Sequence, residues 1–554
     1  MRSIRGISMG EPLFSVSGLS VEFPSAEGAP RRILDNVSFD VGVGESLGVV
    51  GESGSGKTMT ALAVMGLLPF PGRVTAGAIR WEGKDLVSAP VEERRRLRGA
   101  SMGMIFQEPL SSLNPVMTCG DQVVEALRVR EGMTAAAARR RGVELLDRVG
   151  IGDPARRALD YPHQLSGGMR QRVMIAMALA MSPRLLIADE PTTALDVTIQ
   201  AQILDLLAKL CAEEKLALLL ITHNFGVVAR LTQRVVVMNN GKVVEAASTA
   251  ALLAAPREAY TKALLAAVPR LDGPRRAGHV SARASGAPML ELENVSRTFR
   301  LGRSSFMGKP RTLDAVRDVS LTVRRGETLG LVGESGSGKT TLGRMILRLL
   351  KPTAGRVVVD GTDVAALSDR ALRPLRRRMQ MVFQDPAGSL NPRLTVESAL
   401  VEPLEVHGLL RGAAARRRVG ELLEQVGLPA DAARRYPHQF SGGQRQRIGI
   451  ARALALGPEL LVLDEPVSAL DVSVQAQILD LFVRLRKDLD LTSIFIGHDL
   501  AVVRLVCDRV AVMYRGEIVE SGDVETVYAN PLHEYTRSLL AAVPRLTPGS
   551  APPA

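Results

Sequence analysis

The octapeptide GESGSGKT occupies residues 51–58, and the same eight letters return at 333–340. Each copy follows a short apolar run, at 47–50 and 329–332, which is typical of a buried strand. Glycines at such a turn let successive backbone N–H groups point inward and surround an anion. The stretch therefore predicts a phosphate-binding loop in each half of the chain.

The spacing G-x-x-x-x-G-K-[ST] is that of a P-loop, with helices expected over 62–68 and 342–350. In this motif the lysine reaches the β- and γ-phosphates of the nucleotide, and the following hydroxyl binds Mg²⁺. The residues assigned to ATP are Gly51, Ser53, Gly54, Ser55, Gly56, Lys57 and Thr58, and, in the second copy, Gly333, Ser335, Gly336, Ser337, Gly338, Lys339 and Thr340.

A second strand supplies carboxylates in each half, LLIADE at 185–190 and LLVLDE at 460–465. The last residues of a buried parallel strand emerge at the edge of the sheet where the P-loop lies. On its own, Asp-Glu after a strand more often caps a helix, but beside a P-loop it predicts a hydrolytic site. We expect Asp189 and Asp464 to hold Mg²⁺ through water, and Glu190 and Glu465 to polarise the attacking water.

The chain of 554 residues consists of two copies of one repeat. YPHQLSGG at 161–168 returns as YPHQFSGG at 436–443, and the two copies are 282 residues apart at GESGSGKT but 275 apart here. We expect two homologous domains that differ by small loop insertions, at 1–270 and 289–554. Apolar strand-like runs alternate with helical stretches in both, which indicates an α/β fold with a largely parallel sheet.

Residues 271–288, between the two domains, are rich in Gly, Pro, Ala, Ser and Arg and lack apolar periodicity. This composition predicts a flexible, exposed linker.

Composition excludes several classes of protein. No apolar run approaches the roughly 18 residues of a membrane-spanning helix, and the N-terminus has no apolar core of a signal peptide, so we expect a cytoplasmic chain. The three cysteines, Cys119, Cys211 and Cys507, form no CxxC pair, which argues against a zinc site or a disulfide framework. The net charge of +12 is scattered and aromatic residues make up only 3% of the chain, so nucleic-acid binding is not favoured.

At LSGGM (165–169) and FSGGQ (440–444) the sequence resembles an ABC-type ATPase, whose LSGGQ signature begins a helix. A serine and two glycines at a helix N-terminus present a hydroxyl and bare N–H groups to an anion. The signature residues assigned to ATP by the resemblance are Ser166, Gly167 and Gly168 in the first half and Ser441, Gly442, Gly443 and Gln444 in the second.

Further motifs of the family match in both halves. The resemblance implies that Gln107 and Gln384 bind Mg²⁺ and take part in catalysis, and that His223 and His498 contact the γ-phosphate. It also implies D-loop segments at Ala194–Asp196 and Ala469–Asp471, and adenine stacking by Phe23 and Phe299, although a phenylalanine in a strand is more often a core residue. The implied catalytic set is Gln107, Glu190, His223, Gln384, Glu465 and His498, and the implied Mg²⁺ set is Thr58, Gln107, Asp189, Thr340, Gln384 and Asp464.

Three features are specific to a subfamily: EPLSSLNP and DPAGSLNP after the glutamines, YPHQ before the signatures, and YT[KR][AS]LLAAVP near the end of each half. Together they resemble the ATPase subunits of the dipeptide, oligopeptide and nickel importer class. Fused two-domain members similar to this chain include the microcin C and glutathione importer ATPases. Many relatives carry a cysteine cluster for iron–sulfur in the C-terminal extension, which this sequence lacks, so we predict no iron–sulfur cluster.

The resemblance implies two P-loop NTPase domains of ABC type. Each has a mainly parallel sheet core, an antiparallel β subdomain, a helical signature subdomain (roughly 115–165 and 392–440) and a C-terminal extension. In this family the P-loop of one domain and the signature of the other enclose one ATP. We therefore expect head-to-tail pairing of the two halves within the chain, with Ser441–Gln444 facing the first P-loop and Ser166–Met169 facing the second.

The family's activity is ATP hydrolysis with ATP and Mg²⁺, coupled to solute import. The implied partners are two membrane permease subunits and, indirectly, a solute-binding protein, so the implied location is the cytoplasmic face of the inner membrane.

The alternatives are a soluble tandem ABC ATPase that acts on ribosomes or nucleic acid, or a DNA-repair ATPase. The short Pro/Gly-rich linker disfavours the first, because ribosomal members carry a long charged helical linker. The absence of a coiled-coil insertion between P-loop and signature disfavours the second. The solute itself, a peptide or nickel, stays open.

Overall fold

The computed structural model describes residues 12–24, 28–130, 132–193, 195–276, 287–303, 310–468 and 470–546. The chain divides into two compact units, with Val268 ending the main body of unit 1 and Pro269 beginning that of unit 2. Two short pieces depart from this order, since Asp196–Thr198 belongs to unit 2 and residues 544–546 belong to unit 1.

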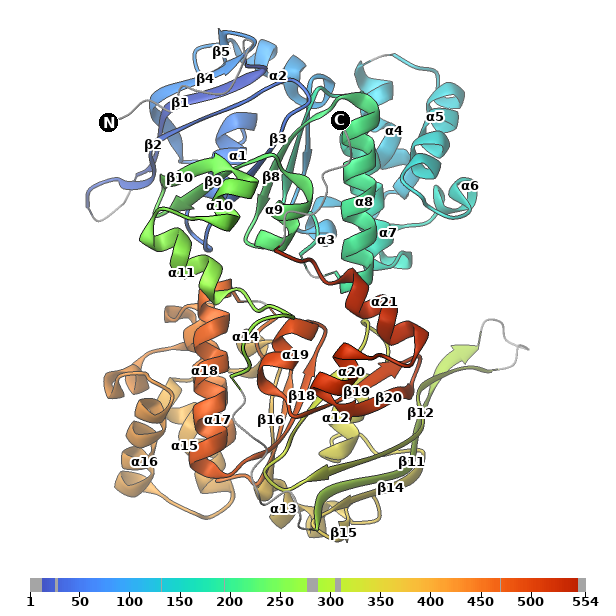
Figure 1. Ribbon diagram of the computed structural model, residues 1–554, viewed down its shortest axis with the longest axis vertical. Helices are drawn as coiled ribbons and strands as arrows, with labels where there is room; N and C mark the ends of the chain where they lie inside the picture. The colour runs from blue at the N-terminus through green and yellow to red at the C-terminus, as the bar shows by residue number, and fades with distance from the viewer. Residues whose placement is uncertain are drawn as a thin grey trace. The chain divides into compact units, whose positions relative to one another are not determined.

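The elements of the two units are shown in Figure 1. The strands of unit 1 are β1 (Phe14–Phe23), β2 (Arg31–Val41), β3 (Ser46–Val50), β4 (Arg73–Trp81), β5 (Lys84–Asp85), β6 (Met102–Ile105), β7 (Leu185–Asp189), β8 (Ala217–Thr222), β9 (Arg234–Asn239) and β10 (Lys242–Ser248). Its helices are α1 (Lys57–Met65), α2 (Val91–Ala100), α3 (Pro109–Ser112), α4 (Cys119–Arg130), α5 (Ala135–Arg148), α6 (Pro154–Arg157), η1 (Pro162–Gln164), α7 (Gly167–Leu179), α8 (Val197–Glu214), α9 (Phe225–Leu231), α10 (Thr249–Ala254) and α11 (Ala259–Ala267).

Unit 2 repeats this order. Its strands are β11 (Pro288–Arg303), β12 (Pro310–Arg324), β13 (Thr328–Val332), β14 (Ala354–Val359), β15 (Thr362–Asp363), β16 (Met379–Val382), β17 (Leu460–Asp464), β18 (Thr492–Gly497), β19 (Arg509–Tyr514) and β20 (Glu517–Asp523). Its helices are α12 (Lys339–Ile346), α13 (Asp369–Arg378), α14 (Pro386–Ser389), α15 (Val396–Val406), α16 (Gly412–Gln425), η2 (Ala430–Arg434), η3 (Pro437–Gln439), α17 (Gly442–Leu454), α18 (Val472–Leu489), α19 (Leu500–Val506), α20 (Val524–Ala529) and α21 (Glu534–Ala542).

Each unit contains two sheets. In unit 1 the six-stranded sheet has the order β10-β9-β3-β8-β7-β6, in which only β10 runs antiparallel to its neighbour. The four-stranded sheet, β2-β1-β4-β5, is antiparallel throughout. Unit 2 has the same two sheets, with the orders β16-β17-β18-β13-β19-β20 and β12-β11-β14-β15. The predicted α/β fold, with a mainly parallel core and an antiparallel subdomain in each half, is confirmed.

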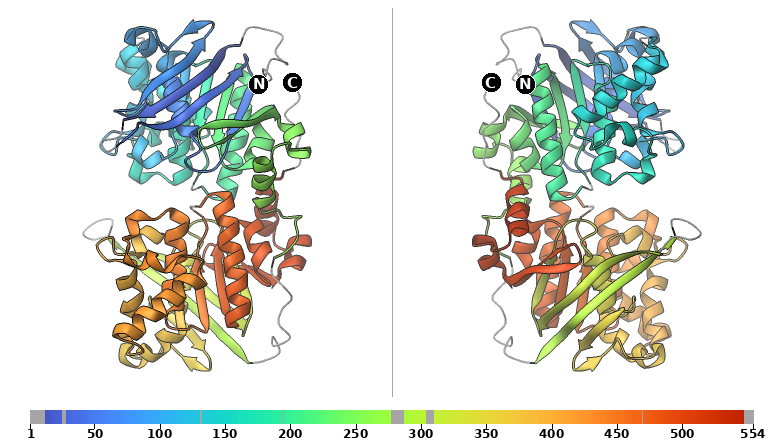
Figure 2. Two further views of the ribbon diagram at one scale, coloured as in Figure 1. Left: turned by 90° about the vertical axis from the view of Figure 1, so that its left-hand side faces the viewer. Right: turned by 90° about the vertical axis from the view of Figure 1, so that its right-hand side faces the viewer.

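Burial explains why the central strands read as unbroken apolar runs. Every residue of β3, β7 and β8 is buried, as expected for parallel strands covered on both faces. In Figures 1 and 2 the helices α4–α7 of unit 1 and α15–α17 of unit 2 form a group distinct from the antiparallel strands of the same unit. These groups are the helical signature subdomains.

The P-loop helices begin earlier and end earlier than 62–68 and 342–350. Helix α1 begins at Lys57, directly after Gly56, whose φ of 101° is in the left-handed region. It ends at Gly66, whose φ of 62° turns the backbone so that its N–H bonds to Ala63 O. The sequence prediction followed the apolar residues and missed that the loop itself supplies the first helical turn.

The start of the predicted linker is attached to unit 2, in contrast to the expectation of a free segment. The backbone N–H of Arg276 donates to Leu505 O at 3.0 Å, and its side chain donates to Ala476 O at 3.0 Å. Arg504 in turn donates to Gly273 O at 2.7 Å. Cations and N–H groups are favourable at the C-terminal end of a helix such as α19, where carbonyl groups lack partners. Residues 277–286 of the predicted linker lie outside the described residues.

The end of the second repeat is likewise part of unit 1 rather than unit 2. Leu546 packs against the apolar cluster around Phe225 and Leu264. A Cβ on Gly226 would lie 2.7 Å from Pro544 Cβ, so a side chain there would have to displace this segment. Each repeat therefore ends in a segment counted with the other unit.

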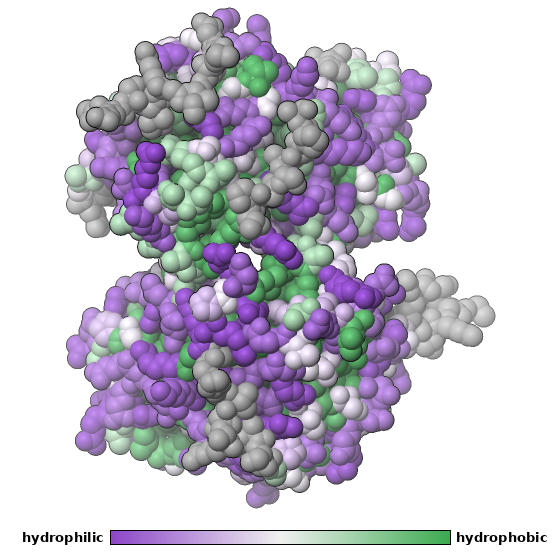
Figure 3. Space-filling view, viewed as in Figure 1, coloured by the Kyte–Doolittle hydropathy of each residue, from purple (hydrophilic) through white to green (hydrophobic). Residues whose placement is uncertain are grey.

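Polar residues cover much of the surface of both units in the view of Figure 3. Among the described residues, no helix is long and apolar enough to cross a membrane. Cys119 and Cys507 are buried, and burial raises the pKa of the Cys119 thiol to about 11, as expected for unreactive thiols.

Candidate nucleotide site

The P-loop of unit 1 wraps around its own lysine. Lys57 is 5% exposed, and its Nζ donates to Gly51 O at 2.8 Å and to Glu52 O at 2.9 Å. At Gly54, where φ is 78°, an added Cβ would meet no atom within 4 Å, so the backbone there faces open space. Open space beside a glycine backbone, next to a buried ammonium group, suits a phosphate group.

Unit 2 repeats this geometry. Lys339 Nζ donates to Gly333 O and Glu334 O, both at 2.7 Å, and burial lowers the pKa of Lys339. Gly336 has the same φ of 78° and the same open space beside its backbone.

The P-loop hydroxyl and the first strand-end carboxylate meet in both units. Thr58 Oγ1 donates to Asp189 Oδ1 at 3.3 Å, and Thr340 Oγ1 donates to Asp464 Oδ1 at 3.0 Å. Both carboxylates are 2% exposed at the ends of β7 and β17. Burial raises the pKa of Asp189 to about 6, with the Thr58 hydrogen bond acting in the opposite direction, and it also raises the pKa of Asp464.

Glu190 is the centre of a hydrogen-bond cluster in unit 1. Its Oε2 accepts from Gln107 Nε2 at 3.1 Å and from Thr193 Oγ1 at 2.8 Å, and its Oε1 lies 3.0 Å from His223 Nδ1. Its φ of 47° is in the left-handed region, and its N–H donates to Ile221 O at 2.8 Å. Burial acts to raise the pKa of Glu190, but His223, Thr193 and Lys57 together outweigh it and the pKa is lowered.

Glu465 occupies the same position in unit 2. Gln384 Nε2 donates to its Oε2 at 3.1 Å, and His498 Nδ1 lies 3.2 Å from the same oxygen. Burial acts to raise the pKa of Glu465, but His498 lowers it overall. The pKa of His498 is raised because Glu465 outweighs the effect of its own burial. An ionised carboxylate next to an imidazole therefore recurs in both units.

Thr193 was missed by the sequence reasoning. It stands three residues after Glu190, and Ser468 stands three residues after Glu465, where its hydroxyl donates to the Glu465 carbonyl at 3.1 Å. The sequence did offer one indication: a residue with a hydroxyl group stands three positions after the glutamate in both repeats, in Thr192–Thr193 and in Val467–Ser468.

The signature residues lie at helix starts, as the resemblance implied. Ser166 caps α7, its Oγ accepting from Met169 N at 3.3 Å. Ser441 caps α17 in the same way, and there Gln444 Oε1 also accepts from Ser441 N at 3.0 Å, completing a reciprocal capping box. The first signature, which ends in methionine, does not have this second bond.

Within unit 2, the signature and the glutamate line one small hollow. Its volume is about 160 Å³, and its lining includes Gln384, Glu465, Gly442 and Arg445. Pockets for small-molecule ligands usually measure about 300–1,000 Å³. This hollow is therefore too small to hold a nucleotide.

Phe23 and Phe299 lie on the antiparallel sheets, on β1 and β11. The neighbouring strand β2 reaches the P-loop, because a Cβ on Gly56 would lie 2.6 Å from Leu34 Cδ2. Arg297 lies 4.8 Å from the centre of the Phe299 ring, whereas Phe23 packs against the core cluster of its unit. Of the predicted D-loop segments, Ala194 and Ala469 lie outside the described residues.

The oxygen donors at this site fit Mg²⁺. In the described part of the chain, no group of three or more His, Cys, Asp and Glu side chains forms a metal centre. Mg²⁺ bound with a nucleotide needs only one or two protein ligands besides phosphate and water. The paired Thr58 and Asp189, with the Gln107 amide nearby on Glu190, supply that donor set.

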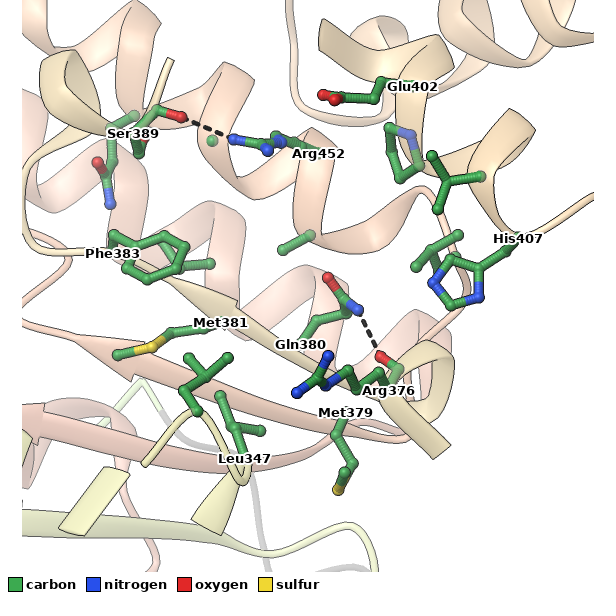
Figure 4. Close-up of a pocket in the computed structure, with 18 residues that line it drawn as sticks. Leu347, Arg376, Met379, Gln380, Met381, Phe383, Ser389, Glu402, His407 and Arg452 are labelled. Atoms are coloured by element: carbon green, nitrogen blue, oxygen red, sulfur yellow. Dashed lines mark hydrogen bonds between the residues drawn. The ribbon is translucent and has the colours of Figure 1, made fainter. Parts of the chain in front are cut away.

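A second hollow in unit 2 lies beside the strand that leads to Gln384 (Figure 4). It encloses about 330 Å³, with Phe383, Met381 and Leu347 along one side and Glu402 and His407 along the other. Arg452 Nη1 donates a hydrogen bond to Ser389 O at 2.7 Å, which connects α17 to the segment after Gln384.

Exposed apolar residues line part of this hollow, and they have counterparts in unit 1. Phe383, Val406 and Leu349 are 41%, 53% and 51% exposed; Phe106, Val129 and Leu67, at matching positions of the repeat, are 40%, 74% and 38% exposed.

Comparison with known proteins places these motifs in a family. The family described as ABC transporter matches residues 34–193 and 316–468, and the oligopeptide/dipeptide transporter C-terminal region matches 244–294 and 519–553. The sequence is 47% identical to the glutathione import ATP-binding protein GsiA of Salmonella paratyphi A, covering 97% of this chain and 90% of that protein. It is 48% identical to the protein of the same name from Pectobacterium atrosepticum, over 96% of this chain and 90% of that protein. A solved dimeric bacterial ABC transporter cassette is 33% identical and covers 43% of this chain and 99% of its own, with a TM-score of 0.39.

Proposed function

Since the chain belongs to the ABC transporter family, in the class with the oligopeptide/dipeptide C-terminal region, we propose that its two P-loop clusters hydrolyse ATP to drive import of a short peptide such as glutathione. The ATPase and importer class follow from the family; the two active sites, the residue roles and the solute are our proposal. The observation that carries it is the repeated cluster in which an ionised glutamate contacts a glutamine and a histidine, directly after the strand-end aspartate that binds the P-loop threonine.

The roles of the residues follow from this geometry. Lys57 and the P-loop N–H groups hold the phosphates, and Glu190, kept ionised by His223, accepts a proton from the attacking water. Thr58, Gln107 and Asp189 would hold Mg²⁺, which neutralises charge on the phosphates when bound. In unit 2 the same roles fall to Lys339, Glu465, His498, Thr340, Gln384 and Asp464.

We further propose that each site is completed by the signature of the other repeat, with domains at 1–270 and 289–554. The small hollow between Glu465 and Gly442 supports this, since a unit alone offers too little room for ATP between its own glutamate and signature. Binding of ATP would then favour the paired state, and hydrolysis would release it.

For the partners, we propose two permease subunits, one with a cytoplasmic segment seated in the hollow beside Phe383 and the other with its segment on the matching exposed apolar residues around Phe106. The support is the matched set of exposed apolar residues next to the segment that carries Gln384 and Gln107, which links the hollow to the catalytic glutamate. The chain would thus lie peripherally on the inner face of the cell membrane, and a solute-binding protein would act through the permeases. The import names of the relatives favour this assignment over action on ribosomes or DNA.

Phe383→Asp and Phe106→Asp test the docking. A carboxylate in an apolar contact costs binding, so we expect less chain retained on membranes that contain the permease subunits of its transporter. Val43→Asp, at an exposed valine in a turn of unit 1, is the matched control and should bind as before. Equal retention of all three variants would contradict the docking site.

Glu190→Gln and Glu465→Gln test the two active sites in the assembled transporter. Each single change should leave roughly half of the ATP turnover, and the double change should lower it by about 100-fold or more, since loss of a general base commonly costs that much. If either single variant kept full turnover, the proposal of two active sites would be wrong.

A further inference from the structure

The C-terminal extension of unit 2 touches the phosphate loop directly. Tyr535 lies in the first turn of α21, and its hydroxyl oxygen accepts a hydrogen bond from the backbone N–H of Glu334 at 3.0 Å. Glu334 is the second residue of GESGSGKT. The repeated YT motif of the extension therefore has a contact at the nucleotide site.

This bond completes the support of one peptide of the loop. The carbonyl oxygen of Glu334 accepts from Lys339 Nζ at 2.7 Å, while its N–H donates to Tyr535. Farther along the loop, the carbonyl of Ser337 accepts from Gly516 N at 3.0 Å, in the turn between β19 and β20. The loop is thus held from outside by the extension and by the turn that leads into it.

The tyrosine is itself fixed in place. Its ring lies 4.2 Å, centre to centre, from that of Tyr514, and its own N–H donates to His533 Nδ1 at 3.1 Å. The residues before α21 are tied to β20, because Glu520 accepts from Leu532 N at 2.8 Å and His533 N at 3.1 Å. Burial raises the pKa of Tyr535, so it stays a neutral phenol around pH 7.

A loop that is already ordered loses less entropy when it closes around a phosphate, and this raises affinity without adding a contact. The N–H of Glu334 is partly buried, so loss of its partner would leave it unsatisfied or let the peptide turn. Either effect acts on nucleotide binding rather than on the chemistry at Glu465.

We propose that Tyr535 is a positioning residue for the second nucleotide site: its hydroxyl holds the Glu334 peptide in the phosphate-binding arrangement, which makes ATP affinity there depend on the C-terminal extension. This rests on the proposed function of residues 333–340 as an ATP site. It gives the tyrosine of the YT motif in the second repeat a role besides packing.

The test is Tyr535→Phe in the full chain, which keeps the ring and removes only the hydroxyl. A second substitution, Lys57→Ala, disables the first site so that ATP binding reports on the second. The dissociation constant for ATP should rise about 3- to 10-fold, the effect of one hydrogen bond, and the KM of the hydrolysing chain should rise with kcat unchanged.

Tyr528→Phe is the matched control. Tyr528, on α20 of the same extension, donates its hydroxyl to Leu500 O at 3.0 Å, in the first turn of α19 rather than to a residue of the P-loop. Removal of the Tyr528 hydroxyl should lower the melting temperature as much as removal of the Tyr535 hydroxyl does. It should leave the affinity for ATP unchanged. Unchanged affinity in Tyr535→Phe, or an equal change in both variants, would overturn the positioning role.

Lys339→Ala in the same background separates this inference from the proposed function. If Lys339→Ala abolishes ATP binding and Tyr535→Phe has no effect, only the role of Tyr535 is wrong. If Lys339→Ala binds ATP normally, the ATP site itself is assigned wrongly.

Discussion

At the scale of single residues, the two glutamates show how backbone geometry aims a side chain. Glu190 and Glu465 have φ of 47° and 45°, a region that costs a residue with a side chain roughly 1–3 kcal/mol. The N–H of each donates to a carbonyl of the neighbouring strand, Ile221 O and Ile496 O, which helps to hold that conformation. The turn brings the carboxylate to the imidazole that follows that strand.

The two signatures differ by one hydrogen bond, and we predict that this difference is measurable. Gln444→Met should lower the free energy of unfolding by about 0.5–1 kcal/mol, because it breaks the reciprocal cap at Ser441. Met169→Gln should give a smaller change, since the new cap at Ser166 replaces apolar contacts of a partly buried methionine. Urea unfolding of the full chain measures both; a larger loss in Met169→Gln would contradict this account of the signatures.

At the scale of elements, each C-terminal extension is anchored by a glutamate, which is buried in unit 1 (Glu245) and partly buried in unit 2 (Glu520). Glu245 accepts from Arg257 N at 2.9 Å and Glu258 N at 3.2 Å, just before α11, and Glu520 does the same before α21. Burial acts to raise the pKa of each carboxyl, but the hydrogen bonds that it accepts lower it overall. The charged form is therefore stabilised by folding.

This lowered pKa predicts a direction for the effect of pH. Each carboxylate stabilises the fold fully above the unfolded-state pKa of about 4.3, and this contribution is lost as pH falls through the lower folded-state pKa. Glu245→Gln should cost about 1–2 kcal/mol near pH 7, because a neutral amide accepts the two N–H bonds less strongly.

Thermal unfolding at pH 7 and below pH 4 measures the difference, with Glu520→Gln as the second-repeat equivalent. The gap between the parent chain and each variant should narrow at acid pH. A gap that widened there would contradict the assigned role.

Much of the fold and site could be predicted from sequence because both depend on residue types with narrow functions. Only glycine suits the left-handed turns of the P-loop, and only an Asp-Glu pair at the end of an apolar strand supplies both carboxylates. Thr193 and Tyr535 could not be found in this way, since a threonine in a turn or a tyrosine in a helix suits many environments. Arg275 and Arg276 looked like part of a loop, although they donate to the Cys507 and Leu505 carbonyls at the end of α19, more than 200 residues away.

At the scale of the whole molecule, the duplication needs an explanation that one unit cannot give. Each unit has a P-loop, a glutamate and a signature, yet the hollow between the last two in unit 2 is only about 160 Å³. Pairing of the repeats would enclose two ATP molecules, each between one P-loop and the opposite signature. Residues 269–276, at the end of the first repeat and the start of the linker, are counted with unit 2, and residues 544–546, near the end of the second repeat, are counted with unit 1.

If the two repeats pair as proposed, Glu190 and Gly442, which lie in different repeats, serve the same ATP. Gly442→Asp and Gly167→Asp are matched signature variants: an added Cβ meets only Leu470 or Leu195 at 3.6 Å, so both should fold, while the new carboxylate repels phosphate. The decisive measurement is ATP turnover of the assembled transporter carrying Glu190→Gln with each of them. We predict that Glu190→Gln/Gly442→Asp keeps the turnover of Glu190→Gln alone and that Glu190→Gln/Gly167→Asp loses it; the reverse pattern would show that each repeat uses its own signature and would contradict the account.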